Sequence, residues 1–196
     1  MTLIKSISGI RGTIGGSTGD NLTPPDIVKY AAAYADWLIQ RNDNQKLRVV
    51  IGRDSRMSGP MVSALVVSTL QFKGVNIVDL GLSTTPTVEM AVVMEYAQGG
   101  IIITASHNPK QWNALKLLNE KGEFISAEDG ASLLQIAEAS TSEFNEVDEL
   151  GEYRADDSYM KKHTDAILAL PLVNVAAVKQ RGFRIAVDAV NSTGAM

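Results

Sequence analysis

The chain has 196 residues, 45% of them hydrophobic and 20% charged, which is typical of a soluble globular protein with one domain or slightly more. Its formal net charge of −4 argues against a surface for nucleic acid or anionic membrane, and the lack of cysteine excludes disulfides, zinc–thiolate sites and thiol nucleophiles. Because there is no apolar signal-peptide core and no run near the ~20 residues of a membrane span, we expect a cytoplasmic protein.

Predicted helices and strands alternate after a glycine-rich opening. Apolar residues at helical spacing predict helices over 23–42, 60–72 and 86–96. Short apolar runs, which indicate strands buried on both faces, lie at 47–51, 75–80 and 101–104. This alternation predicts an α/β fold, a three-layer α/β/α domain with a mixed, mainly parallel sheet.

The next segment departs from this alternation. Residues 114–118 and 123–125 are separated by a glycine-containing loop, which predicts a hairpin that closes the sheet edge in antiparallel sense. A helix is expected over 127–139. The acidic stretch 140–157 lacks apolar periodicity and is interpreted as a connection with one short strand.

The C-terminal part predicts the start of a second α/β unit. A helix is expected over 158–170, and residues 184–190 indicate another buried strand. One helix and one strand enclose too little surface to form a core of their own. We therefore place the first domain at 1–150 and the first elements of a second domain at 156–196.

The most informative string is IIITASHNP at 101–109. Proline fixes φ and lacks an N–H, so Pro109 prevents simple continuation and leaves Ser106 and His107 on a loop at the carboxyl end of a strand. Open α/β sheets form their ligand crevices at that end, and Arg53 also follows a strand, so both loops are expected to face one crevice. Judged as isolated residues, Ser, His and Asn at such a place more often satisfy local backbone groups.

Other chemistries fit these residues poorly. There is no G-x-S-x-G elbow, and the side chains of the adjacent Ser106 and His107 diverge, which disfavours a serine hydrolase. The phosphate-loop motif G-x-x-x-x-G-K-[ST] is absent, and the early glycines lack the preceding strand of a dinucleotide site.

Phosphoryl storage on serine fits better, because a phosphoserine is stabilised by surrounding cations. The cations in or beside the motif loops are Arg11, Arg53, Arg56, Lys110 and Lys116. Arg11 is a candidate phosphate contact, whereas Arg56 and Lys110 are expected to be exposed, solubilising charges.

Three strings in register resemble one known family. TASHNP with the following Asn113 and Lys116, SGIRGTIGG at 8–16 and GRDSRMSGP at 52–60 are similar to motifs of the α-D-phosphohexomutases, which include phosphoglucomutase, phosphomannomutase and phosphoglucosamine mutase. The resemblance covers the whole chain. It implies that 1–150 is the first of four domains, with the catalytic serine loop, and that 156–196 is the truncated start of the second.

The resemblance also implies a reaction. Ser106 would carry a phosphoryl group and donate it to a hexose phosphate, and the hexose 1,6-bisphosphate, the activating intermediate, would return its other phosphoryl group to the serine. Lys116 would transfer a proton at the reacting hydroxyl, while His107 and Arg11 would bind or orient phosphate and hydroxyl groups. Further candidates for substrate or phosphate binding are Arg53, Asn108 (also a loop-shaping residue) and Asn113.

Two departures from the family pattern stand out. Alanine occupies position 114, where the family usually has glycine, and this would strain the loop if φ there were positive. The family's Mg²⁺ loop, sugar-recognition loop and C-terminal phosphate loop are expected to be absent from this chain. Ser106 would then contribute to the Mg²⁺ site only through its phosphate, since Mg²⁺ requires several oxygen ligands.

Two functions therefore remain open. The first is an enzyme, the N-terminal part of a phosphohexomutase acting on a glucose, glucosamine or mannose phosphate. The second is a binding module that holds a phosphosugar or phosphate without turnover. The apolar residues of the last segment would be bare without a partner, so a homodimer through that segment is a further expectation. These residues are Ile167, Leu168, Leu170, Leu172, Val173 and Val175.

Overall fold

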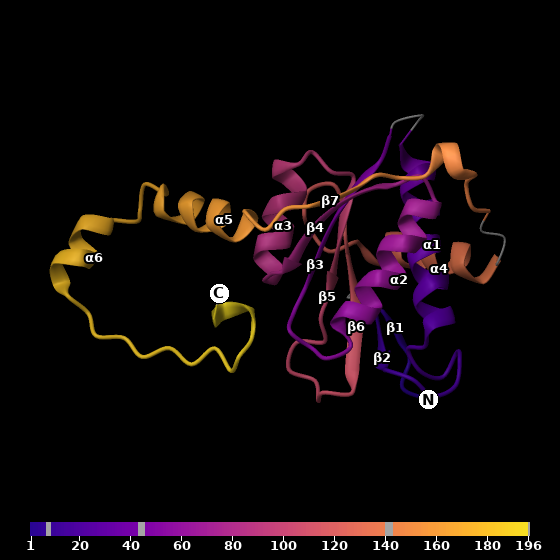
Figure 1. Ribbon diagram of the computed structural model, residues 1–196, viewed down its shortest axis with the longest axis horizontal. Coiled ribbons are helices and arrows are strands. Elements are labelled where there is room, and N and C mark those ends of the chain that lie inside the picture. Colours follow the sequence, from indigo (N-terminus) through magenta and orange to yellow (C-terminus); the bar gives the residue numbers. More distant parts are fainter. Residues whose placement is uncertain (7–8, 43–45, 140–142, 196) are drawn as a thin grey trace.

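The computed structural model describes residues 1–6, 9–42, 46–139 and 143–195. In this described part, seven strands form one sheet in the order β1-β2-β6-β5-β3-β4-β7 (Figure 1). The strands are β1 (Ile4–Ser6), β2 (Gly9–Thr13), β3 (Arg48–Arg53), β4 (Asn76–Leu82), β5 (Gly99–Ile103), β6 (Trp112–Leu118) and β7 (Tyr153–Ala155).

The helices confirm most of the predicted positions within a few residues. They are α1 (Pro24–Arg41), α2 (Gly59–Phe72), α3 (Thr85–Met94), α4 (Ala127–Ala139), α5 (Tyr159–Leu168) and α6 (Val175–Arg181), with short 3₁₀ turns at Val147–Glu149 and Thr193–Ala195. The start of α1 shows how the sequence sets such a boundary. The Thr23 N–H donates to the Asp26 carboxylate at 3.1 Å, and prolines fill the first turn, where no N–H is needed.

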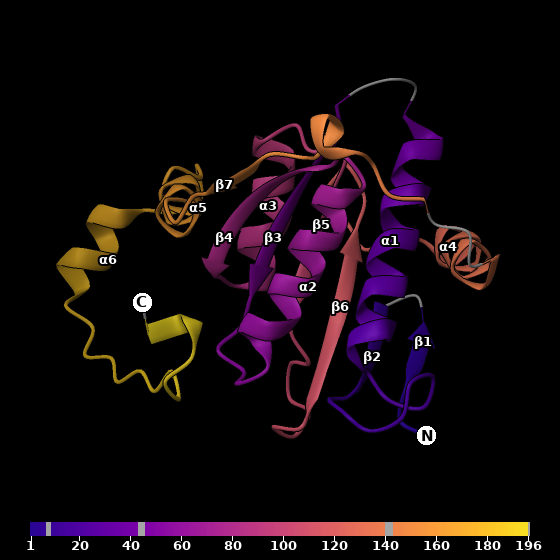
Figure 2. The same ribbon diagram turned by 45° about the vertical axis from the view of Figure 1, so that its right-hand side comes forward.

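The sheet lies between two helical layers, as the sequence predicts (Figure 2). Val49 and Ile51 of β3 belong to the core that includes residues of α1, α2 and α4. Val50, between them, belongs to a second core with residues of α3. This alternation is the two-residue period of a strand buried on both faces. It confirms the three-layer α/β/α fold.

The sheet is mixed. β5, β3, β4 and β7 run parallel to one another, whereas β6 is antiparallel to both β5 and β2. The prediction that residues 114–125 form a hairpin at the sheet edge is therefore wrong. Residues 123–125 form no strand and contribute only the bridge of Phe124 to Leu118, and β6 lies inside the sheet. The reason is that β2 from the glycine-rich opening occupies the far side of β6. Gly9 permits this approach, since a Cβ there would lie 2.0 Å from the Leu115 carbonyl oxygen.

The C-terminal part joins the sheet through its first residues, and near its end the Ser55 Oγ of the loop after β3 donates to the Ser192 Oγ at 3.2 Å. β7 pairs with β4, so the sheet extends past residue 150, and Tyr159 of α5 is buried in the second core. The predicted strand over 184–190 is wrong, because these residues have no regular structure and, within the described part of the chain, no neighbouring strand to pair with. Figure 1 shows α5 and α6 leading away from the sheet and the segment after α6 turning back toward it. No described helix is both long and apolar enough to cross a membrane.

Candidate active site

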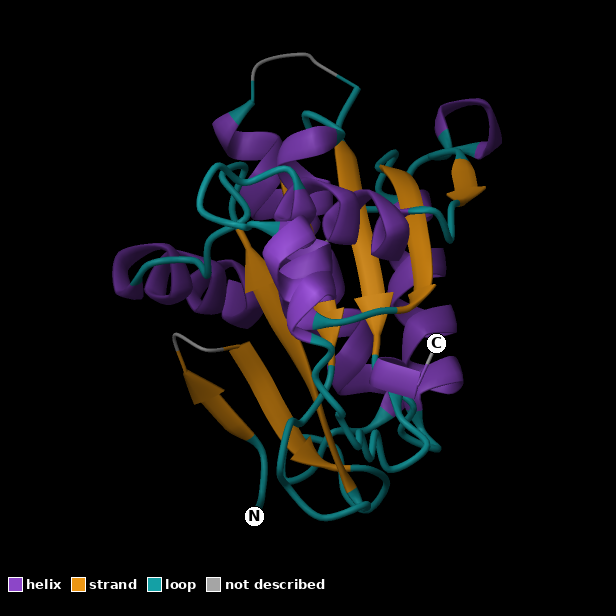
Figure 3. Cartoon of the chain, turned by 90° about the vertical axis from the view of Figure 1, so that its left-hand side faces the viewer, coloured by secondary structure: helices purple, strands orange, loops and turns teal. Residues whose placement is uncertain are grey.

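The serine loop joins β5 to β6 at the end of the sheet where β3 and β5 finish (Figure 3). Ser106 is exposed, and its φ is +52°, in the left-handed region that residues other than glycine seldom adopt. Such conformations persist only where the surroundings impose them, and they concentrate at functional sites. The loop therefore holds its serine in a specific, strained geometry.

Lys116 lies beside this serine. Its Nζ donates to the Ser106 Oγ at 3.1 Å. The lysine is half-buried on β6, and its ammonium lies 5.7 Å from the centre of the Phe124 ring. Glu89 of α3 also faces it: burial raises the pKa of the Glu89 carboxyl, while the Lys116 charge opposes that rise.

Arg11 shares the sheet face of this pair. It lies opposite Ala114 in the ladder between β2 and β6, and Lys116 is two residues further along β6. Residues two apart on a strand point to the same face, so Arg11 and Lys116 are diagonal neighbours. Within the described part of the chain, the buried Nε of Arg11 has no hydrogen-bond partner. A free, buried guanidinium donor beside Lys116 favours an anionic or hydroxyl-bearing ligand.

Three further candidates lie in the serine loop or at the start of β6: His107, Asn108 and Asn113. His107 is exposed next to Ser106. Asn108 shapes the loop, since its Nδ2 donates to the Ala105 carbonyl at 3.1 Å. Asn113 is fully buried, and its Nδ2 donates to the Ser58 Oγ at 2.9 Å. Its amide therefore ties β6 to the start of α2 and does not face a ligand.

The prediction that Arg53 shares a crevice with Ser106 is wrong in its geometry. Gly52 points toward α3, where a Cβ would lie 2.5 Å from a Val88 methyl, so the next residue along β3 points to the opposite face. There Arg53 lies against Gly59 of α2 and lines a hollow of about 570 Å³ together with Asp79. The Lys116 ammonium is on the other side of the sheet.

Arg56 is the residue that sequence reasoning missed. Its side chain is only 11% exposed, which contradicts the expected solubilising role. It donates to the backbone carbonyls of Ser106 and Asn108, both at 2.7 Å, and its Nε pairs with Asp54 at 3.2 Å. The available signal was GRDSRMSGP, in which Asp54 and Arg56 are two residues apart on a loop at the carboxyl end of a strand.

Alanine at position 114 introduces no backbone strain into this loop. Ala114 lies within β6 and is not among the residues with positive φ. The substitution for glycine is therefore compatible with the serine loop.

The described residues alone do not provide a metal centre. They contain no group of three or more His, Cys, Asp or Glu side chains that could hold an ion. A Mg²⁺ site needs several oxygen ligands, and the serine loop supplies one hydroxyl.

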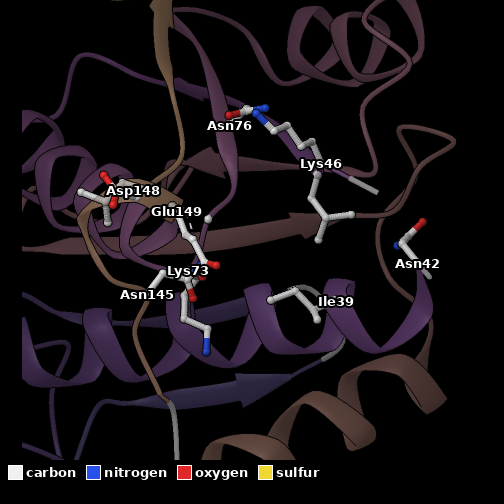
Figure 4. A pocket seen from close by; sticks show the side chains of 11 residues that line it. Ile39, Asn42, Lys46, Lys73, Asn76, Asn145, Asp148 and Glu149 are labelled. Carbon is white, nitrogen blue, oxygen red and sulfur yellow. Dashed lines mark hydrogen bonds between the residues drawn. The ribbon is translucent and has the colours of Figure 1, made fainter. Parts of the chain in front are cut away.

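A separate hollow lies at the opposite end of the sheet. It encloses about 500 Å³ and is lined by Ile39 of α1, Asn76 of β4 and Asn145, among others (Figure 4). Leu47, which also lines it, immediately precedes β3. Because Ser106 follows the carboxyl end of the neighbouring parallel strand β5, this hollow is distinct from the serine loop.

Known proteins resemble this chain over most of its length. Residues 3–144 match the family described as phosphoglucomutase/phosphomannomutase, alpha/beta/alpha domain I. The chain is 33% identical over 187 residues to a phosphoglucomutase/phosphomannomutase of Thermococcus kodakarensis, covering 94% of this chain and 40% of that protein. It is 27% identical over 191 residues to a phosphoglucosamine/phosphogalactosamine mutase of Sulfurisphaera tokodaii, covering 96% and 39%.

A solved structure shows the same fold. The crystal structure of a phosphoglucomutase/phosphomannomutase family protein from Burkholderia thailandensis superposes with a TM-score of 0.68 at 23% identity, covering 85% of this chain and 36% of that one. The chain thus spans about 40% of the length of these relatives. From the match over domain I and the two curated relatives, the chain belongs to the phosphoglucomutase/phosphomannomutase family.

Proposed function

We propose that this chain forms the phosphoserine-bearing part of a phosphohexomutase that interconverts hexose 1-phosphate and hexose 6-phosphate. The observation that carries the proposal is the 3.1 Å contact between the Lys116 Nζ and the Ser106 Oγ. An exposed serine held in a strained loop against an ammonium group is suited to accept and release a phosphoryl group.

The chemistry follows from these two groups. When phosphorylated Ser106 reacts, the bond between phosphorus and Oγ breaks and a bond from phosphorus to a sugar hydroxyl oxygen forms. The Lys116 ammonium is placed to give a proton to the departing Oγ, and the attacking sugar hydroxyl releases its own proton to solvent. In the return step the Ser106 Oγ attacks the other phosphoryl group of the hexose 1,6-bisphosphate and gives its proton to the neutral Lys116 amine. The bond from phosphorus to the sugar oxygen breaks, and that oxygen takes up a proton from solvent.

Two neighbours would bind the substrate. Arg11 offers the free Nε beside Lys116, and His107 is exposed next to the serine. Guanidinium and imidazole groups both donate hydrogen bonds to phosphate oxygens. The proposal covers glucose, glucosamine and mannose phosphates alike.

For the whole protein the proposal includes Mg²⁺, to which Ser106 would contribute a phosphate oxygen. Bound there, Mg²⁺ would neutralise negative charge on the phosphoryl group being transferred. The side chains described in this chain do not fit a complete Mg²⁺ site.

A second function suits the chain by itself. The buried Arg11 Nε, which has no hydrogen-bond partner among the described residues, and the Lys116 ammonium on the same sheet face are suited to hold an anion without any reaction. This arrangement favours a module that holds a phosphosugar or phosphate without turnover.

The test is phosphate transfer to the protein. The purified chain is incubated with ³²P-labelled hexose 1,6-bisphosphate and Mg²⁺, and the labelled residue is identified by mass spectrometry. Label on Ser106 that is lost in Ser106→Ala supports the proposal. Ser55→Ala is the matched control, because Ser55 is also an exposed serine on the neighbouring loop.

Turnover by the purified chain tests the binding-module alternative. We expect the chain to give negligible conversion of hexose 1-phosphates, even with Mg²⁺, and to retain phosphosugar binding in calorimetry. Robust turnover by the purified chain would contradict the binding-module alternative. Label on another residue, or none, would contradict the role of Ser106.

A further inference from the structure

We propose that Asp54, Arg56 and Thr104 are positioning residues that impose the left-handed conformation on Ser106 and thereby aim its Oγ at Lys116. The inference rests on the proposed function of Ser106 as the phosphoryl carrier. It assigns a role to the GRDSRMSGP segment, which the proposed chemistry leaves unused.

The central observation is a closed ring of hydrogen bonds that begins and ends at Ser106. The Ser106 N–H donates to the Thr104 Oγ1 at 3.0 Å, and that hydroxyl donates to the Asp54 Oδ2 at 2.6 Å. The Arg56 Nε donates to the same carboxylate oxygen at 3.2 Å, and the Arg56 Nη2 donates to the Ser106 carbonyl at 2.7 Å, which closes the ring. The peptide groups on both sides of the serine are therefore fixed by one connected set of side chains.

Every N–H donor of the Arg56 side chain is used to hold the serine loop. A guanidinium has five N–H donors, and here each has an acceptor. Besides the bonds to Asp54, Ser106 and Asn108, the Nη1 donates to the carbonyls of Pro109 at 2.9 Å and Trp112 at 3.0 Å. No donor is left for a substrate phosphate, so Arg56 organises the loop and does not bind the substrate.

Two features make the ring rigid. Thr104 is buried, and the side chain of Asp54 is 19% exposed, so these hydrogen bonds have little competition from water. Asp54 is itself fixed, because its N–H donates to the Ile103 carbonyl of β5 at 3.1 Å and its Oδ1 accepts from the Arg56 N–H at 3.0 Å. The ring thus joins the carboxyl ends of β3 and β5.

The energetic argument concerns the serine backbone. A left-handed φ is unfavourable for an L-residue, so without its two anchors Ser106 would relax to a negative φ. That rotation swings the Cα–Cβ bond and takes Oγ away from the Lys116 Nζ. Ser106 would remain chemically intact and would lose its alignment.

The experiment uses two nearly isosteric changes, Thr104→Val and Arg56→Lys. Valine removes the hydroxyl that connects Ser106 to Asp54, and lysine keeps the charge with three donors in place of the planar five. The matched controls are Thr69→Val, which removes a buried hydroxyl bonded to the Leu65 carbonyl at 2.7 Å, and Arg48→Lys at the other end of β3.

Two readouts are compared in the intact chain. The first is the intraresidue NOE between the amide and α protons of Ser106, which is strong at positive φ and weak at negative φ. The second is the rate of ³²P transfer from hexose 1,6-bisphosphate to Ser106. We expect Thr104→Val and Arg56→Lys to weaken the NOE and to slow transfer at saturating bisphosphate by at least about tenfold, since small misplacements of reacting groups carry such costs.

The outcomes are distinguishable. A strong NOE and wild-type transfer in Thr104→Val would overturn the inference, as would equal losses in Thr69→Val. If the wild-type chain takes up no label, the proposed function fails, and the NOE alone then decides whether the ring controls the serine backbone. If Arg56→Lys does not fold, Thr104→Val still provides the test.

Discussion

Two apolar segments of this chain look alike in sequence and differ completely in structure. Residues 101–103 and 184–190 are both rich in β-branched residues, and both predict buried strands. The first is β5, in which Ile101, Ile102 and Ile103 are at most 1% exposed. In the second, Ile185 and Val187 are 78% and 80% exposed.

The two segments differ in the strands and helices that surround them. β5 is hydrogen-bonded to β3 on one side and to β6 on the other, and α3 and α1 cover its two faces. Residues 184–190 have no strand beside them in the described part of the chain. An apolar pattern therefore indicates that a segment is suited to burial, and only the strands around it make it a strand.

The largest expected effect comes from removing the same side chain in both segments. Ile101→Ala leaves a cavity in a packed core and should lower the free energy of unfolding by about 2–5 kcal/mol. Ile185→Ala removes a mostly exposed side chain and should change it by no more than about 0.5 kcal/mol. Urea denaturation followed by circular dichroism measures both. A comparable loss in Ile185→Ala would show that this segment is buried in solution.

The same contrast explains which parts of the fold were predictable. The order of strands and helices follows from periodicity, because each apolar run up to residue 118 meets partners in the same chain. The central position of β6 was not predictable in this way. It depends on β2, whose sequence GIRGT has too little hydrophobicity to be recognised as a strand and pairs through backbone groups.

The candidate site likewise contains residues that the sequence identifies and residues whose surroundings it does not indicate. The pair Ser106 and Lys116 was identified from motifs, whereas Arg53 and Arg56 were assigned the wrong surroundings. For Arg53 the signal existed, because it continues the alternation of Val49 and Ile51 toward the α2 face. For Arg56 the partners are mainly backbone carbonyls, whose directions depend on loop conformation. The spacing of Asp54 and Arg56 in GRDSRMSGP is a signal for their ion pair and gives no indication of the carbonyl contacts.

A second prediction concerns what covers the exposed apolar side chains of residues 167–190, which are the segment meant in this prediction and its test. A cluster of exposed apolar side chains is unfavourable in water, so we expect the segment to pack on a second copy of the chain or to be exchanged with one. Its most exposed members are Leu172, Ile185, Val187 and Val190. Light scattering should then give a mass that rises with concentration toward twice the 21.0 kDa of one chain.

Charge placed in the segment tests this association. Leu172→Asp should shift the equilibrium toward the monomer, because leucine here is 98% exposed in the single chain and available to a partner. Val147→Asp is the control, since Val147 is 77% exposed outside the segment. A wild-type mass that stays at one chain across concentrations, with a protease-resistant C-terminus, would contradict the dimer.

The smallest effect is expected at the junction of the two regions, where α5 packs on α3. Tyr159 donates to the Glu95 carboxylate, which also accepts from Arg154 at 2.7 Å. Burial, together with the Glu95 hydrogen bond and charge, raises the pKa of Tyr159 to about 12, from an ordinary 10.0. Because the folded pKa is raised, this contribution to stability is complete below pH 10 and is lost as the pH rises toward about 12.

Tyr159→Phe isolates this contribution, because other tyrosines that titrate, including the buried Tyr34, are the same in both proteins. The difference in melting temperature between wild type and variant should be on the order of a few °C at pH 8 and should shrink steadily between pH 10 and 12. Circular dichroism melts across this range measure it. A difference that stays constant would mean that the phenol ionises equally in the folded and unfolded chain, and would contradict a stabilising role for the hydrogen bond between Tyr159 and Glu95.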